Sequence, residues 1–168
     1  MRIWCFDNFL PVNIMYTINN EFKNILWRFG SSSTKNDDHA SKFWYKELIN
    51  TNSILEIKKH IEISCDKEIK IDRMYMNGQA HSQSGFWHID AYKEPNKEKI
   101  TMVYFLKPWP PEYGGHLMIK TENDVFSFLP KQNRAVFFQS HMEHMALEPS
   151  CYCKTQRESI AVKFTIQE

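Results

Sequence analysis

Hydrophobic residues in the first part of the chain recur at the spacing of a helix. After Pro11, apolar side chains from Ile14 to Phe29 fall three or four positions apart, and Gly30 follows where helices commonly end. The pattern therefore predicts an amphipathic helix over this stretch. The next segment, 31–41, is polar and has a serine run and paired aspartates, which is typical of an exposed connection within a domain.

A second helix is predicted to begin near Ser53. Ser53 and Glu56 have the separation of a capping box, in which each side chain accepts a hydrogen bond from the other residue's backbone amide. Apolar residues then recur on one face of this helix, namely Ile54, Ile57, Ile61 and Cys65. Helices therefore dominate the predicted front of the chain, residues 1–66.

From Ile69 onward the period changes to two residues, which indicates a strand, with Arg73 and Tyr75 in step with Ile69 and Ile71. Turn residues then separate further short runs of strand character. These runs are Phe86 to Ala91, Ile100 to Leu106, His116 to Lys120, Val125 to Phe128, Ala135 to Phe138 and Ser159 to Ile166. Many short strands after a helical front predict a mainly β fold, a sandwich or barrel of jelly-roll type with helices on one side.

Composition agrees with one folded domain spanning residues 1–168, with a jelly-roll core at 67–168. Hydrophobic residues make up 42% of the chain and aromatic residues 14%, enough to fill a core. The net charge is only +1 and no dense Lys/Arg stripe occurs, so nucleic acid is a disfavoured partner. The start of the chain has no basic segment followed by an apolar one, and no stretch has the length to span a bilayer. We therefore expect a cytoplasmic protein with no membrane partner.

The cysteines do not form a regular framework. Cys5, Cys65, Cys151 and Cys153 are expected to remain reduced in an intracellular chain of this size. Cys151 and Cys153 are separated by one residue and have no second Cys or His pair matched to them, so an ordinary loop or strand is favoured over a metal site.

Two residues in the sequence FWHIDAY carry the first chemical signal. His88 and Asp90 are two apart, so on a strand both side chains project from one face and can meet one ion. A second histidine from a distant strand would complete the two-His, one-carboxylate triad that suits iron(II) with open coordination positions. His144 is the candidate, and His116 and His141 are its competitors. A His-x-Asp pair alone is weak evidence, because surface hydrogen bonds produce the same pattern.

A second signal lies near the end of the chain. Arg157 and Ser159 are two apart at the start of a predicted strand and would share its inward face. A guanidinium pairs with a carboxylate through two parallel hydrogen bonds, and a neighbouring hydroxyl adds a third. The pair therefore suits an anionic ligand, whereas the simpler alternative is a surface arginine.

The ordered set of motifs resembles the prolyl 4-hydroxylase-like branch of the Fe(II)/2-oxoglutarate-dependent dioxygenases. HID at His88 to Asp90, then YGGHL, FFQSHMEHMALEPS and RES at Arg157 to Ser159 occur in the family's order, and DNFLP and MYMNGQ extend the likeness toward the start. The resemblance implies a double-stranded β-helix, with His88, Asp90 and His144 as metal ligands. It also implies that Arg157 and Ser159 bind the far carboxylate of 2-oxoglutarate, and that Tyr75 contacts this cosubstrate.

The resemblance further implies a hydroxylase that uses Fe(II), 2-oxoglutarate and O2, with ascorbate as an optional reductant, and that releases succinate and CO2. It favours His144 over His141, because the MALEPS stretch and the distance to Arg157 match the family. The chain departs from the family at Gly114-Gly115-His116, where Gly-Gly-Glu is common, and at Phe105, where a tyrosine often faces the cosubstrate. The far-carboxylate contact then falls to Ser159 or to Tyr75, and the sequence does not choose between them.

Several alternatives stay open at this level. Phe86, Trp87 and Trp109 can stack on a substrate or pack in the core. The expected substrate is a peptidyl-prolyl residue or a small molecule. A metal-binding jelly roll without oxygenase activity, such as an isomerase or a binding module, is the alternative function, and a structural protein with incidental His and Asp residues is a third. Either the segment 31–41 or the loop 78–85 is a possible lid over the barrel.

Overall fold

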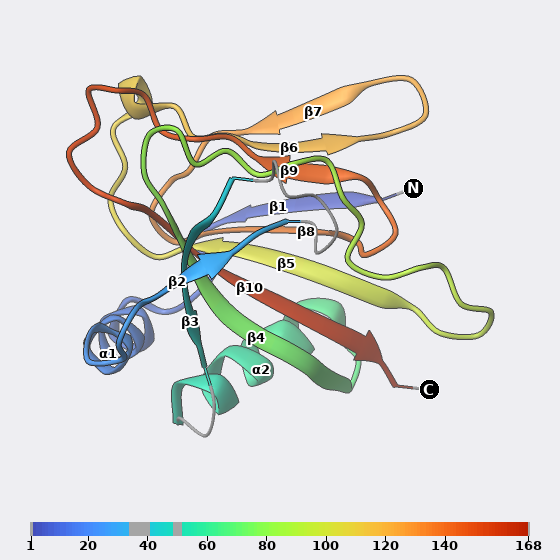
Figure 1. Ribbon diagram of the computed structural model, residues 1–168. Helices are drawn as coiled ribbons and strands as arrows, with labels where there is room; N and C mark the ends of the chain where they lie inside the picture. Colours follow the sequence, from blue (N-terminus) through green and yellow to red (C-terminus); the bar gives the residue numbers. More distant parts are fainter. Residues whose placement is uncertain (1, 34–40, 49–51, 168) are drawn as a thin grey trace.

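The computed structural model describes residues 2–33, 41–48 and 52–167, and within these ranges the strands form two antiparallel sheets (Figure 1). The larger sheet has seven strands in the order β1-β8-β5-β10-β4-β3-β2, and the smaller has three in the order β7-β6-β9. The larger sheet consists of β1 (Ile3–Asp7), β2 (Arg28–Ser31), β3 (Phe43–Glu47), β4 (Ile69–Gln79), β5 (Lys99–Phe105), β8 (Arg134–Gln139) and β10 (Arg157–Ile166). The smaller consists of β6 (Leu117–Lys120), β7 (Val125–Phe128) and β9 (His144–Ala146). The fold is the expected mainly β jelly roll.

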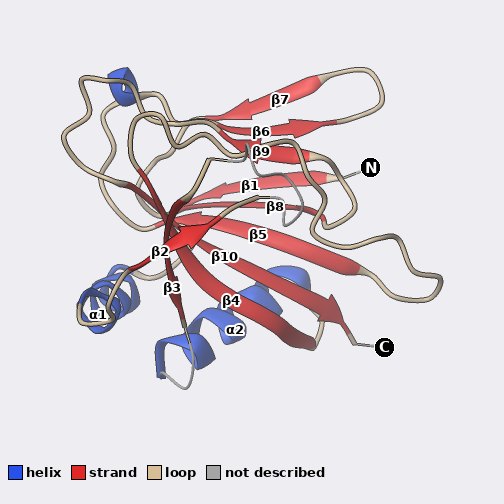
Figure 2. Ribbon diagram, in the orientation of Figure 1, coloured by secondary structure: helices blue, strands red, loops and turns tan. Residues whose placement is uncertain are grey.

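Two helices lie against the outer face of the larger sheet, as Figure 2 shows in blue. They are α1 (Val12–Lys23) and α2 (Asn52–Cys65), and a short 3-10 turn covers Pro111–Tyr113. None of the helices in the described ranges combines the length and the apolar character that crossing a bilayer requires.

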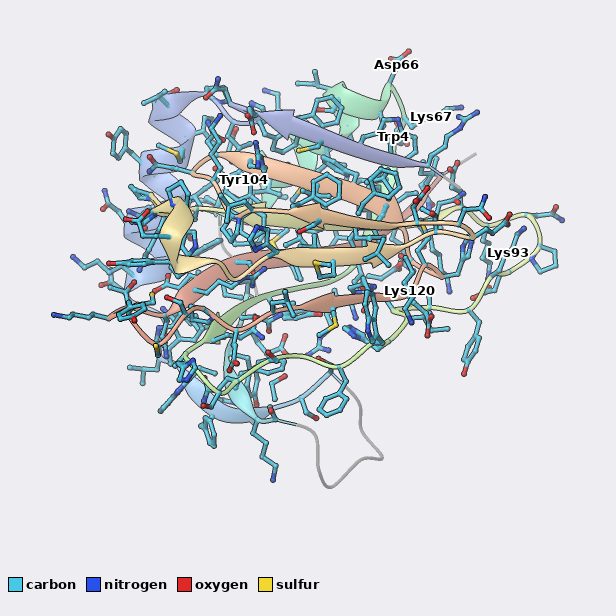
Figure 3. All side chains as sticks on the ribbon, turned by 90° about the horizontal axis from the view of Figure 1, so that it is seen from above. Trp4, Asp66, Lys67, Lys93, Tyr104 and Lys120 are labelled. Atoms are coloured by element: carbon cyan, nitrogen blue, oxygen red, sulfur yellow. The ribbon has the colours of Figure 1, made fainter. Side chains whose placement is uncertain are left out.

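The alternation of strand side chains divides the interior into two hydrophobic clusters. On β5, Met102 and Tyr104 face the helices, whereas Val103 and Phe105 face the smaller sheet. The helix-side cluster includes Phe22 of α1 and Ile61 of α2, both almost fully buried. Tyr104 is buried, with 1% of its surface exposed, whereas Lys93 lies on a loop that projects away from the sheets (Figure 3). Because one face of β5 packs on helices, its other face is available to build a site between the sheets.

The predicted first helix is wrong in its length. Helix α1 ends at Lys23, and Phe29 and Gly30 belong to the strand β2. Strand β2 pairs with β3, so its backbone hydrogen bonds are made in the sheet instead of in a helix. Three strands of the larger sheet, β1, β2 and β3, thus lie in the part of the chain that the sequence predicted to be helical.

The start of α2 also differs from the capping box predicted for Ser53 and Glu56. The Ser53 backbone amide donates to the carboxylate of Glu21 at 3.1 Å, and the Ser53 hydroxyl donates to the same oxygen. A residue of α1 therefore takes the capping role that the sequence assigned to Glu56. These two hydrogen bonds between Ser53 and Glu21 join α2 to α1.

The predicted strand from Phe86 to Ala91 is wrong, because only a single bridge forms there, between His88 and His144. The two residues exchange backbone hydrogen bonds of 3.1 and 2.9 Å, and the amide of Asp90 then donates to Ser140. The segment therefore pairs with β9 at a single residue and forms no strand of its own. His88 and Asp90 are held by these few bonds, and they still reach the same site.

Candidate metal and cosubstrate site

A pocket of about 380 Å³ lies where the two sheets face each other. Strands β4 and β10 are paired, and the alternate residues that point away from the helices line it. On β10 these residues are Arg157, Ser159, Ala161 and Lys163, and on β4 they are Arg73, Tyr75, Asn77 and Gln79. The predicted residues His88, Asp90 and His144 line the same pocket, so all six predicted site residues meet in one place.

One ligand atom from each of His88, Asp90 and His144 lies within 4.8 Å of the others, so the three residues can hold a metal ion. The Nε2 atom of His88 is 3.7 Å from Oδ1 of Asp90, and Nε2 of His144 is 3.5 Å from Oδ2. Two imidazoles and one carboxylate form the facial set typical of non-haem iron(II). The donor set therefore fits this metal.

Both histidines are hydrogen-bonded so that Nε2 faces the pocket. Nδ1 of His88 is 2.8 Å from the Phe86 carbonyl oxygen, and Nδ1 of His144 is 3.0 Å from the Met142 carbonyl oxygen. Each Nδ1–H donates to its carbonyl, which leaves a lone pair on Nε2. Burial lowers the pKa of His144 to about 4, so this imidazole is neutral at pH 7 and needs to lose no proton before it binds a metal.

Asp90 is oriented by two neighbours. The hydroxyl of Thr101 donates to Oδ2 at 2.7 Å, and the ammonium group of Lys163 lies 2.6 Å from Oδ1. Burial alone would raise the pKa of Asp90, but the electrostatic interactions with His144 and Lys163, with hydrogen bonds from Lys163 and Thr101, outweigh it and hold the pKa below its usual value. Asp90 is therefore ionised in a pocket where its side chain is only 3% exposed.

Arg157 forms the closed end of the pocket and is 1% exposed. Its Nε donates to the carbonyl oxygen of Gly115 at 2.5 Å, and its Nη1 donates to Oε1 of Gln79 at 3.0 Å. Its Nη2 is buried and has no hydrogen-bond partner among the described residues. A buried charged donor without an acceptor is costly, so this atom marks a position for an anionic ligand. Burial lowers the pKa of Arg157 to about 10, and the side chain stays protonated at pH 7.

The departures from the family pattern have structural counterparts around Arg157. The ring of Phe105 lies 5.2 Å from the guanidinium carbon, so it packs on the cation without supplying a hydroxyl. The Ser159 hydroxyl is 3.4 Å from Nη1 of Arg157, whereas Tyr75 on β4 lies opposite Ala161 and its ring is 5.5 Å from the Lys163 nitrogen. Of the two residues left open by the sequence, Ser159 is therefore the one that lies beside the anchor.

The other aromatic and histidine residues considered in the sequence lie elsewhere. Trp109 donates to the Gly114 carbonyl and packs against Tyr113, and a lysine lies over the ring of Trp87. Phe86 is 40% exposed. These aromatic residues and the histidines at 116 and 141 are absent from the described lining of the pocket. Most of the segment 31–41 lies outside the described residues, but its first three residues, Ser31, Ser32 and Ser33, line the pocket.

Sequence reasoning missed several residues of the site. Thr101 and Lys163 hold Asp90, and Gln79 holds Arg157. The signal for Lys163 and Gln79 was available, because they are in phase with Ser159 and Tyr75 on the same strands. The interaction of Thr101 depends on how the preceding loop folds back onto β5, which periodicity does not reveal.

Comparisons with known proteins identify the family of the chain. The family model of the 2OG-Fe(II) oxygenase superfamily matches residues 73–164, more than half of the chain. Comparison with curated protein sequences finds no match. A 2OG-Fe(II) oxygenase family oxidoreductase from Burkholderia pseudomallei has a similar structure, with a TM-score of 0.76 and 13% identity over 97% of this chain and 84% of that one.

Two prolyl hydroxylases are also similar in fold. One, from Trichoplax adhaerens, was solved with a hypoxia inducible factor peptide and has a TM-score of 0.72 and 15% identity over 96% of this chain and 82% of that one. The other is a viral collagen prolyl hydroxylase from Paramecium Bursaria Chlorella virus-1 in complex with 2OG, with a TM-score of 0.66 and 15% identity over 99% and 96% of the two chains. At these identities the likenesses show a shared fold. The chain belongs to the 2OG-Fe(II) oxygenase superfamily and is a dioxygenase that depends on Fe(II), 2-oxoglutarate and O2.

Proposed function

We propose that His88, Asp90 and His144 hold the iron and that Arg157 anchors the far carboxylate of 2-oxoglutarate. The observation that carries this proposal is the buried Nη2 of Arg157, which has no partner among the described residues and belongs to the same pocket as the three ligands. A dicarboxylate that is fixed at Arg157 can present its keto acid end toward the metal ligands. A metal-binding module without oxygenase chemistry has no need for this second anchor.

The residues around the anchor fix the direction of the cosubstrate. Gln79 and Gly115 each accept a hydrogen bond from Arg157, so the guanidinium is held rigidly with Nη2 free. Ser159 lies beside Nη1 and is placed to donate its hydroxyl hydrogen to the same carboxylate. Tyr75 lies further along the pocket and is the proposed second contact to the cosubstrate. Preorganised donors of this kind need no rearrangement when the ligand binds.

The proposed reaction is hydroxylation of a C–H bond in a peptidyl-prolyl residue or a small molecule. Bound Fe(II), O2 and 2-oxoglutarate supply the oxidising chemistry, in which decarboxylation of the cosubstrate to succinate and CO2 is coupled to substrate hydroxylation. The chain contributes the ligand geometry, the charged anchor and walls that exclude water from the closed end. Support for the substrate comes from the similarity to prolyl hydroxylases, one of which was solved with a peptide.

The test is succinate formation from 2-oxoglutarate by the Fe(II)-loaded protein under oxygen. We expect wild type to form succinate slowly without added substrate, and we expect Asp90→Asn and His144→Ala to lose this activity together with measurable binding of Co(II). Arg157→Met should keep Co(II) binding and lose 2-oxoglutarate binding. His141→Ala is the matched control, because His141 is three residues from His144 and lies outside the pocket.

Two results would count against the assignment. Equal Co(II) affinity in wild type and Asp90→Asn would remove the triad as the metal site. Loss of metal binding in His141→Ala, with His144→Ala unaffected, would transfer the distal ligand to His141.

A further inference from the structure

The pocket has a second positively charged end. In the pairing of β10 with β4, Arg157 lies opposite Gln79 and Lys163 lies opposite Arg73. Lys163 is six residues from Arg157 on the same face, which is about 20 Å along a strand. Arg157 is 1% exposed, whereas the side chains of Lys163 and Arg73 are 23% and 50% exposed. The pair Lys163 and Arg73 therefore marks the open end of the pocket.

Two cations directly opposite each other on a sheet destabilise it unless other groups compensate. Lys163 is compensated by Asp90 at 2.6 Å, and Arg73 by Glu47 at 2.5 Å. The ring of Tyr75 lies near both cations, 4.4 Å from the Arg73 guanidinium carbon and 5.5 Å from the Lys163 nitrogen. In the described part of the chain, Asp90 is the one carboxylate within 4.0 Å of Lys163.

Asp90, the counter-ion of Lys163, is also a proposed metal ligand. Once the metal binds, the negative charge of Asp90 is therefore shared between Lys163 and the metal. A divalent metal and the dianionic cosubstrate cancel each other. Among the lining residues that the structure describes, three side chains are positively charged, Arg73, Arg157 and Lys163, and one is negatively charged, Asp90. Glu47 neutralises Arg73 from outside the lining. The loaded pocket thus keeps one uncompensated positive charge, and Lys163 is the cation placed to carry it at the open end.

We propose that Lys163, supported by Arg73, forms a carboxylate-binding subsite and that the substrate is a small carboxylic acid. The inference rests on the proposed function. A surplus of one positive charge matches a carboxylate, whereas a phosphate monoester carries closer to two negative charges at pH 7. The pocket of about 380 Å³ is open at this end, so it can hold the cosubstrate and the part of the substrate that carries the carboxylate. An interior peptidyl residue offers no charge to Lys163.

Binding of acids and of their amides tests this subsite directly. The probes are free amino acids, 2-hydroxy acids and aliphatic monocarboxylic acids, each beside its primary amide. Calorimetric titration into protein loaded with Zn(II) and 2-oxoglutarate measures binding without turnover, and stimulation of succinate formation by the Fe(II) protein measures coupling. We expect at least one acid to bind at least tenfold more tightly than its amide. Lys163→Met should bring acid and amide to equal affinity, and Lys163→Arg should retain a preference for the acid.

Lys99→Met is the control for removing a paired lysine. The Lys99 side chain is 27% exposed, similar to the 23% of Lys163, and it forms an ion pair with Glu94. Lys99 is the first residue of β5 and lies outside this pocket. It should keep the full preference for the acid. Since the acid and its amide are compared in wild type as well, the test does not depend on any one variant folding.

The outcomes separate this inference from the proposed function. Succinate formation by wild type without any preference for acids over amides would overturn the subsite and leave the oxygenase assignment intact. Loss of Zn(II)-dependent 2-oxoglutarate binding in both Lys163→Met and Lys163→Arg would also overturn it, because Lys163 would then support the metal centre alone. Absence of succinate and of metal-dependent 2-oxoglutarate binding in wild type would remove the proposed function itself.

Discussion

Substitutions at two adjacent glycines near Arg157, the proposed cosubstrate anchor, distinguish the effect of backbone strain from the effect of a side-chain contact. Gly114 and Gly115 have positive φ angles of 62° and 71°, which L-amino acids rarely adopt. A Cβ atom at Gly115 would lie 2.9 Å from Cδ of Arg157, whereas a Cβ at Gly114 would meet no atom within 4 Å. The glycine at 115 is therefore needed for the position of Arg157.

We predict that Gly115→Ala weakens 2-oxoglutarate binding about tenfold, which corresponds to about 1.4 kcal/mol, because Arg157 has to shift. Gly114→Ala is the control, because it also places an alanine at a positive φ but makes no contact, and it should bind 2-oxoglutarate as wild type does. Titration of the cosubstrate into Zn(II)-loaded protein measures both. Equal affinity in the two variants would show that Arg157 tolerates the added methyl group.

At this scale the sequence predicted the charged and ligating residues but not the atoms that hold them. His88, Asp90 and Arg157 were found because their residue types and order are unusual. The need for Gly115 depends on a distance to a side chain 42 residues away, which no local pattern contains.

At the scale of elements, Asn133 joins the chain between β1 and α1 to the central strands. Its Oδ1 accepts hydrogen bonds from the Leu10 amide at 2.9 Å and from the Tyr104 hydroxyl at 3.0 Å, and its Nδ2 donates to the Leu10 carbonyl at 2.8 Å. All three bonds are buried, and Asn133 has a φ of 61°, which asparagine tolerates better than most residues. One side chain thus fixes the connection that leads into α1.

We predict that Asn133→Gly lowers the free energy of unfolding by about 2–4 kcal/mol, because glycine keeps the backbone angle but leaves buried partners unpaired. Urea denaturation of the metal-free protein measures the change. Asn96→Gly is the control, since Asn96 has the same φ of 61° on an exposed loop. It should change stability by less than about 0.5 kcal/mol. A similar loss in both variants would assign the effect to the backbone instead of to the hydrogen bonds.

Sequence periodicity located several strands, but it failed at elements that depend on pairing with a distant strand and at the shortest one. The alternation from Ile69 correctly predicted β4, and the run Val125 to Phe128 matches β7. The apolar residues up to Phe29 fitted a helix, yet β2 forms there because it pairs with β3, a contact that local spacing does not encode. Strand β9 has three residues, too few for a periodic signal, although it positions His144.

At the scale of the whole molecule, the proposed site joins segments that are far apart in the chain. His88 and Asp90 lie between β4 and β5, His144 begins β9 in the smaller sheet, and Arg157 begins β10 in the larger one. A metal bound by the triad would link the loop between β4 and β5 to the smaller sheet, and a cosubstrate would extend the link to β10 in the larger sheet. Ligands that bind only the folded state stabilise it by mass action. Binding should therefore raise the melting temperature in an ordered way.

We predict that Zn(II) raises the melting temperature and that 2-oxoglutarate adds a further rise only when the metal is present. At a concentration 100 times its dissociation constant each ligand adds about 2.7 kcal/mol, or about 5–10 °C for a chain of this length. Arg157→Met should keep the increment from Zn(II) and lose the increment from 2-oxoglutarate, whereas Asp90→Asn should lose both. Each increment is measured within one variant, so differences in baseline stability cancel. A 2-oxoglutarate increment of equal size with and without the metal would mean that the cosubstrate binds at Arg157 alone, with its keto acid end free of the metal centre.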